Sequence, residues 1–144
     1  MESGTLARDT PREMSQENVD RFLETTEVFN RGDVERWLEI FHPDAVLELR
    51  DVELEGKYSG HDGVRRFLAE FAESFETFEL DCPDVRDLGD RVLGLGTLRN
   101  IGRGSGIEQE VPVALVASYR DGLCTHLKDY GEWGQALEAV GLSE

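Results

Sequence analysis

Three stretches in the N-terminal half place apolar residues at helical spacing, so each is predicted to form a helix with one apolar face. The first begins at Ser15, a favourable N-cap residue, and ends at Gly32, the second begins at Asp33, and the third covers residues 61–75. His42 and Pro43 end the second helix, because proline disfavours helical backbone at the residue before it. The positions that form the three stripes are Val19, Phe22, Leu23, Thr26 and Phe29, then Val34, Trp37, Leu38 and Phe41, then Val64, Phe67, Leu68, Phe71 and Phe75.

Other segments alternate between apolar and polar residues, which is typical of strands with one buried face. Residues 45–54 and 77–88 are predicted strands, separated by a loop at 56–60 that holds Tyr58 and by the third helix. Pro83 places the second of these strands at a sheet edge or at a bulge, since proline cannot donate a ladder hydrogen bond.

The C-terminal part is predicted to form three consecutive antiparallel strands, at 91–101, 107–120 and 123–132. The glycine-rich sequence at 102–106 reverses the chain between the first two strands, because glycine adopts positive φ without steric cost. Asp121 and Gly122 form a two-residue hairpin turn before the third strand. A short helix at 135–140, ended by Gly141, follows.

This order predicts an α+β fold, in which the N-terminal helices pack on a curved, mostly antiparallel sheet to form a cone-shaped domain. Residues 15–144 are expected to form this single domain. Residues 1–14 show no periodicity and are predicted to be a disordered tail or, alternatively, an arm that packs on a partner subunit. The open end of such a cone is where a ligand is expected to bind.

The charge of the chain excludes several kinds of partner. Acidic residues number 31 against 15 basic residues, which gives a net charge of −16. Nucleic acids and anionic membranes need a basic surface, so neither is an expected partner. No apolar run approaches the ~20 residues of a membrane span, and residues 1–14 lack the apolar segment of a signal peptide.

Cysteine usage indicates the cellular compartment. Cys82 and Cys124 are the only cysteines, and no Cys and His residues have the spacing of a zinc site. This sparse usage predicts reduced thiols in a cytoplasmic protein, with a disulfide between the two as the alternative. No metal or organic cofactor is predicted.

Several short motifs resemble those of a known family. Residues 30–33 (Asn-Arg-Gly-Asp), followed by Trp37 and by Phe-His-Pro-Asp-Ala at 41–45, are similar to the opening motif of SnoaL-like polyketide cyclases. These belong to the nuclear transport factor 2-like superfamily, which also contains the ketosteroid isomerases. Residues 60–64 and the turn at 121–122 fit the same pattern. The resemblance covers roughly residues 15–142 and implies the cone fold.

The same comparison excludes one activity of the superfamily. A ketosteroid isomerase needs a carboxylate base and two oxyanion donors, a Tyr and a protonated Asp. Aligned without gaps, the base position falls on Leu49 and the donor positions fall on Thr25 and Val116. None of these side chains supplies the required group, so steroid isomerisation is not expected.

Asp129 is the strongest candidate for a catalytic residue. Residues 127–132 (Leu-Lys-Asp-Tyr-Gly-Glu) resemble the last-strand motif of limonene-epoxide-hydrolase-type enzymes, where the first Asp is catalytic, and the His-Trp-Asp motif of the cyclases. The epoxide hydrolases also need an Arg-x-Asp motif, which residues 96–99 lack, so their triad is incomplete here.

Strand alternation places Asp129 on the same face as Leu127 and Gly131, which indicates the inner face. A carboxylate among apolar walls is expected to have a raised pKa and to act as a general acid or base. The alternative is that Asp129 pairs with a buried donor or faces solvent. The opposite face carries His126, Lys128 and Tyr130, and the resemblance implies that a homodimer forms through this outer sheet face.

Four further residues are expected to contact a ligand. Tyr58 would close the mouth of the cone and donate a hydrogen bond, unless it is an ordinary half-buried aromatic. Arg99 would orient an anionic or enolate-bearing ligand, unless it forms an ion pair with Glu108 or Glu110 across the hairpin. The two expected apolar contacts with the ligand are Trp37 and Val116. Trp37 also fits the apolar stripe of the second helix and is alternatively a core residue.

The sequence supports two hypotheses of different classes. The first is a cofactor-free cyclase or isomerase of a hydrophobic, polyketide-like small molecule, in which Asp129 moves one proton. The second is a non-catalytic ligand-binding or dimerisation module of the same fold. An Asp129 side chain inside the cone with a second polar side chain nearby favours the enzyme. An exposed or ion-paired Asp129 beside a wholly apolar or filled interior favours the module.

Overall fold

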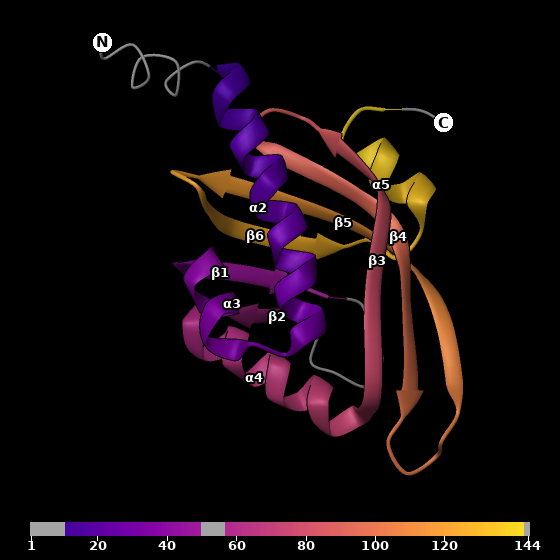
Figure 1. The fold of residues 1–144 in the computed structure, drawn as a ribbon. Helices are drawn as coiled ribbons and strands as arrows, with labels where there is room; N and C mark the ends of the chain where they lie inside the picture. Colours follow the sequence, from indigo (N-terminus) through magenta and orange to yellow (C-terminus); the bar gives the residue numbers. More distant parts are fainter. Residues whose placement is uncertain (1–10, 50–56, 143–144) are drawn as a thin grey trace.

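The structure is a computed structural model, and it describes residues 11–49 and 57–142 of the chain. Within these ranges the chain forms one sheet and its covering helices (Figure 1). The helices are α2 (Pro11–Arg31), α3 (Val34–Ile40), α4 (Gly60–Ser74) and α5 (Trp133–Ala139). The strands are β1 (Phe41–Glu48), β2 (Lys57–Ser59), β3 (Phe75–Asp87), β4 (Arg91–Gly102), β5 (Glu108–Arg120) and β6 (Leu123–Asp129).

The six strands form one sheet in the order β2-β1-β6-β5-β4-β3. Neighbouring strands are antiparallel except for β1 and β6, which are parallel, with Leu47 opposite Leu127. Side chains from α2, α3 and α4 share one buried cluster with the inner face of the sheet, and Figure 1 shows these helices on that side. The predicted α+β cone, with helices on a mostly antiparallel sheet, is therefore confirmed.

The long hairpin of β4 and β5 forms as predicted. Its register places Arg91 opposite Ser118 and Ile101 opposite Glu108. At the next turn, Asp121 and Gly122 have φ angles of 54° and 80°. Positive φ at both central residues matches the right-handed twist of the flanking strands, so this turn joins β5 to β6 tightly.

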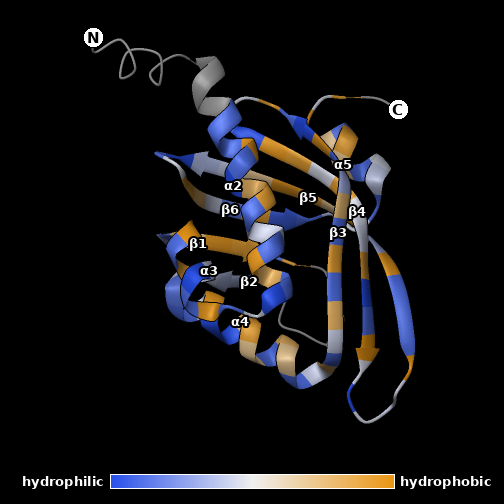
Figure 2. Cartoon of the chain, in the orientation of Figure 1, coloured by the Kyte–Doolittle hydropathy of each residue, from blue (hydrophilic) through white to orange (hydrophobic). Residues whose placement is uncertain are grey.

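A glycine on the inner face of β4 determines how closely α2 approaches the sheet. Phe22 of α2 is almost fully buried, and a Cβ atom added at Gly94 would lie 2.3 Å from Phe22 Cζ. The missing side chain therefore makes room for the aromatic ring. Figure 2 shows hydrophobic and hydrophilic residues alternating along α2 and β3, as expected for elements with one buried face.

A second buried cluster lies on the outer face of the sheet, where α5 packs. Its members are Leu93 and Leu95 of β4, Ala114 and Val116 of β5, and Ala136 and Leu137 of α5. The central strands are therefore apolar on both faces, unlike the edge strands.

The predicted N-terminal boundary is wrong. The first helix begins at Pro11, so residues 11–14 are helical instead of belonging to the predicted tail, while residues 1–10 lie outside the described part of the chain. Proline suits the first helical position, because the N–H that it lacks has no helical partner there. The strong N-cap residue Ser15 therefore lies inside α2.

Two predictions between α3 and α4 also need correction. His42 and Pro43 lie in β1, which begins at Phe41, and residues 50–54 of the predicted strand fall outside the described residues. Proline is tolerated in β1 because the pairing with β6 is interrupted between Phe41 and Val46. The segment at 56–60 was predicted as a loop, but residues 57–59 form the short edge strand β2.

The prediction for Pro83 is confirmed in both its forms. β3 is an edge strand, and its register with β4 shifts between Asp81 and Asp84. The irregularity lies where proline cannot donate a hydrogen bond, so the flanking ladder is preserved.

Candidate functional site

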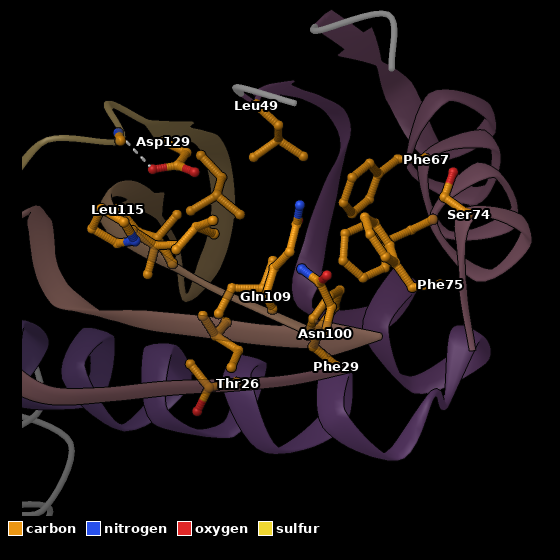
Figure 3. A pocket seen from close by; sticks show the side chains of 18 of the residues that line it. Thr26, Phe29, Leu49, Phe67, Ser74, Phe75, Asn100, Gln109, Leu115 and Asp129 are labelled. Carbon is orange, nitrogen blue, oxygen red and sulfur yellow. Dashed lines mark hydrogen bonds between the residues drawn. The ribbon is translucent and has the colours of Figure 1, made fainter. Parts of the chain in front are cut away.

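A cavity of about 800 Å³ lies between the helices and the inner face of the sheet. Its walls include residues of α2, α4 and strands β3 to β6 (Figure 3). Six aromatic side chains line it: Phe22, Phe29, Trp37, Phe67, Phe71 and Phe75. The polar side chains that line it include Thr25, Thr26, Ser74, Asn100, Gln109 and Asp129. The pocket is thus mainly apolar, with aromatic and aliphatic walls and polar groups at fixed places, as in most small-molecule sites.

Trp37 belongs both to the core and to the wall of the pocket. Its indole is 97% buried and donates a hydrogen bond to the backbone carbonyl of Thr25 at 3.2 Å. Its ring centroid lies 4.7 Å from that of Phe41 and 5.7 Å from that of Phe29. This packing fixes the ring, so Trp37 offers a rigid apolar surface to the cavity.

Asp129 lies at the end of β6 and lines the pocket, on the same face as Leu127. Its Oδ1 accepts hydrogen bonds from the backbone N–H of Ala114 at 3.1 Å and of Gly131 at 2.8 Å. The second bond closes a turn of the kind that Asp side chains favour, and Gly131 supports it with a φ of 79°. The carboxylate is therefore held in one orientation at the pocket wall (Figure 3).

Tyr58 does not line this pocket, so its predicted position at the mouth is not supported. The side chain is fully buried, and its hydroxyl donates a 2.7 Å hydrogen bond to Glu70 Oε1 of α4. Its ring packs edge-on against Phe67 with 5.5 Å between centroids. Tyr58 therefore joins β2 to α4 behind the aromatic wall.

The other two predicted ligand contacts also lie away from the cavity. Arg99 is half exposed, and its guanidinium lies 3.5 Å from Glu79 and 4.0 Å from Glu110. This agrees with the predicted alternative for Glu110, whereas Glu79 of β3, the nearer partner, was not predicted. Val116 is buried in the outer cluster beneath α5, on the face opposite the pocket. The prediction that Arg99 and Val116 contact a ligand in this cavity is therefore not supported.

His126 lies half-buried on β6, paired with β1. Its Nε2 lies 2.6 Å from Glu48 Oε2, and this hydrogen bond lowers the pKa of Glu48 below its ordinary value. Lys128, two residues further along β6, places its Nζ 4.7 Å from the centroid of the Tyr130 ring. These charged and aromatic groups are therefore committed to contacts away from the pocket lining.

Both cysteines are free thiols, as the sequence predicted. Burial is the main cause that raises the pKa of Cys82 to about 12, with smaller contributions from the negative charges of Asp81 and Asp129. Burial also raises the pKa of Cys124 to about 12. Neither thiol is suited to act as a nucleophile near neutral pH, since the thiolate is the reactive form.

Within the described ranges, no three His, Cys, Asp or Glu side chains gather closely enough to hold a metal ion. The absence of a cofactor remains a prediction. None of the helices in these ranges combines the length and the apolar character that a membrane span requires.

Sequence reasoning missed Asn100, which is the most unusual polar residue of the pocket. It is only 4% exposed, and its side-chain oxygen makes no hydrogen bond within the described part of the chain. The available signal was alternation: Asn100 lies two residues beyond Leu98 and therefore on the same inner face of β4. Thr25 and Leu49, the positions compared with a ketosteroid isomerase, also line the pocket.

These features define the class of protein: an α+β cone with a pocket between its helices and its sheet. The family model described as "SnoaL-like domain" matches residues 19–127. The chain therefore belongs to the SnoaL-like domain family. A search of curated proteins found no significant match.

Solved structures share this fold at low sequence identity. TerC, co-crystallised with polyporic acid, is 24% identical with a TM-score of 0.73, and the match covers 86% of this chain and 98% of TerC. An NTF2-like protein of unknown function from Burkholderia pseudomallei is 22% identical with a TM-score of 0.74, covering 87% and 98%. A putative polyketide cyclase from Xanthomonas campestris is 20% identical with a TM-score of 0.69, covering 88% and 98%. At this identity the likeness establishes the fold alone.

Proposed function

We propose that this protein binds a hydrophobic, polyketide-like small molecule and catalyses its cyclisation or isomerisation without a cofactor. The observation that carries the proposal is the Asp129 carboxylate, which lines an aromatic cavity of about 800 Å³. The neighbours support a small-molecule ligand, because TerC was crystallised with polyporic acid and another neighbour is described as a putative polyketide cyclase.

Asp129 would act as a general base on a carbon acid. The carboxylate takes a proton from a C–H bond next to a carbonyl group, which leaves an enolate. In an isomerisation the same proton returns to a different carbon; in a cyclisation the enolate carbon bonds to a second carbonyl carbon, and the resulting alkoxide takes the proton. A positioned base of this kind typically contributes 10²–10⁴-fold to the rate, and the aromatic walls limit competing reactions with water.

Proton abstraction can be tested before the substrate is known. The ketone 2-tetralone carries acidic C–H bonds beside an aromatic ring, and its deuterium uptake in D₂O is measured by NMR. The protein should accelerate this exchange, and Asp129→Asn should reduce the acceleration by about 100-fold or more. Asp44→Asn, at an exposed position of β1, serves as the matched control and should exchange like the wild type. Equal exchange rates in Asp129→Asn and wild type would end the catalytic proposal.

A second function is favoured by the contacts of Asp129 itself. Its Oδ1 joins the backbone of β5 to the turn that follows β6, through Ala114 and Gly131. These hydrogen bonds give the carboxylate a structural role at the end of β6. A structural role for Asp129 is what a non-catalytic binding module of this fold would show. Under this alternative 2-tetralone binds without accelerated exchange. Asp129→Asn lowers the free energy of unfolding by about 1–3 kcal/mol, because a neutral amide oxygen accepts from the two N–H groups less strongly than the carboxylate does.

We also propose that two copies associate through the outer sheet face formed by β1 and β6. Beyond α5, this face presents the Glu48–His126 pair and the Lys128–Tyr130 contact. Sedimentation equilibrium should give the mass of two chains. His126→Glu should release monomers, because it places a second negative charge beside Glu48 on each of the two facing surfaces, so the surfaces repel each other. A wild-type protein with the mass of one chain would refute the dimer.

A further inference from the structure

Asn100, which lines the pocket, carries a buried side-chain oxygen that no hydrogen-bond donor of residues 11–49 or 57–142 reaches. Asn100 is 96% buried, and its Oδ1 has no partner within the described part of the chain. Figure 3 shows the amide end of this side chain directed into the cavity, beside Gln109. An unpaired acceptor in such a place costs folding free energy, because the hydrogen bond it made to water in the unfolded chain is not replaced.

The neighbouring polar groups of the pocket differ from Asn100 in this respect. The hydroxyls of Thr25, Thr26 and Ser74 donate to backbone carbonyls of their own helices at 2.7–3.0 Å. Arg103 donates to the carbonyls of Ala72 and Phe75 near the end of α4. These groups are satisfied within the protein, so they have less to gain from a ligand.

The position of Asn100 also separates it from Asp129. Asp129 pairs with Leu115, and Leu115 pairs with Gly94, which lies six residues before Asn100 on β4. At roughly 3.3 Å per strand residue, this corresponds to about 20 Å along β4. The two side chains therefore lie at opposite ends of the pocket, and a small molecule can reach one without the other.

We propose that Asn100 is the specificity-determining residue of this pocket, and that it accepts a hydrogen bond from a phenolic hydroxyl or N–H group of an aromatic ligand. This inference rests on the proposed small-molecule function and narrows its ligand class. The aromatic wall binds the apolar body, while the Asn100 oxygen selects a ligand with a donor at the end remote from Asp129. A ligand without that donor leaves the buried oxygen unpaired and binds more weakly.

Matched probes test the assignment. Equilibrium dialysis compares 2-naphthol, which has a hydroxyl donor, with 2-methoxynaphthalene, which has the same rings but no donor. The methoxy compound is the more apolar, so an undifferentiated apolar pocket would bind it at least as well. The wild type should instead prefer 2-naphthol by about tenfold, which corresponds to ~1.4 kcal/mol. Asn100→Leu should abolish or reverse that preference, because it removes the acceptor while preserving the branched shape of the side chain.

Two controls separate the possible failures. Asp44→Asn, at an exposed position of β1 outside the pocket lining, should retain the preference for 2-naphthol. Equal or tighter binding of 2-methoxynaphthalene by the wild type would overturn the role of Asn100 and leave the pocket proposal intact, and this comparison requires no variant to fold. Failure of both probes to bind would overturn both proposals, and an Asn100→Leu protein that keeps the preference would overturn the assignment alone.

Discussion

The contact between Phe22 and Gly94 allows a quantitative test of what limits the approach of α2 to the sheet. A methyl group at position 94 would lie 2.3 Å from Phe22 Cζ and 2.6 Å from Cε2. Carbon atoms in contact normally lie about 3.5–4.0 Å apart, so the buried ring would have to retreat by about 1 Å. Overpacking of this kind costs about 1–3 kcal/mol, against which the better strand propensity of Ala returns about 0.5 kcal/mol.

Gly94→Ala should therefore lower the free energy of unfolding by about 1–2 kcal/mol, measured by urea denaturation with far-UV circular dichroism. Phe22→Leu should also destabilise, because it leaves a cavity, but by less than the 3–5 kcal/mol of a change from Phe to Ala. In the double variant the smaller side chain vacates the space that the new methyl group occupies. We therefore expect the double variant to be more stable than the sum of its parts predicts, by about 1 kcal/mol or more.

Gly96→Ala provides the matched control for this cycle. Its methyl group would lie 1.9 Å from the backbone oxygen of Asp81 in β3, which a change in Phe22 cannot move. Phe22→Leu should not rescue Gly96→Ala. Additive effects of Gly94→Ala and Phe22→Leu, to within about 0.5 kcal/mol, would show that the ring does not control the approach of α2.

Two further predictions concern the hydrogen bonds between Asn30 of α2 and Leu80 of β3, and the buried thiols. The Asn30 side chain both donates to and accepts from the backbone of Leu80, at 2.9 and 2.7 Å. Asn30→Leu should therefore lower the free energy of unfolding in urea by about 1 kcal/mol, whereas Asn100→Leu should leave it unchanged or raise it. An Asn100→Leu protein that is destabilised while Asn30→Leu is not would contradict this contrast. Because burial raises the pKa of Cys82 and Cys124 from 9.0 to about 12, the native state holds these protons more tightly. The free energy of unfolding should therefore fall as the pH rises from about 9 toward 12. At pH 8 a disulfide reagent should label the thiols of the native protein far more slowly than those of the urea-unfolded protein. Equal labelling rates would refute the burial of the two thiols.

The order of helices and strands was largely determined by the sequence, because it depends on local periodicity. The stripes of α2, α3 and α4 follow from spacing alone, and the turn at Asp121 and Gly122 follows from the backbone freedom of those two residues. Alternation along β6 was sufficient to place Asp129 on the face of the pocket, since polar and apolar residues are clearly separated around it.

The tertiary structure decided what local patterns leave ambiguous. β5 is apolar on both faces where α5 covers its outer side, so alternation alone could not show that Val116 faces away from the pocket. Tyr58 is buried against Phe67 and donates a hydrogen bond to Glu70, twelve residues away. Asn100 is distinctive because no donor in the described part of the chain reaches its side-chain oxygen. Such properties depend on which distant side chains meet after folding, and only the packed arrangement of helices and sheet determines them.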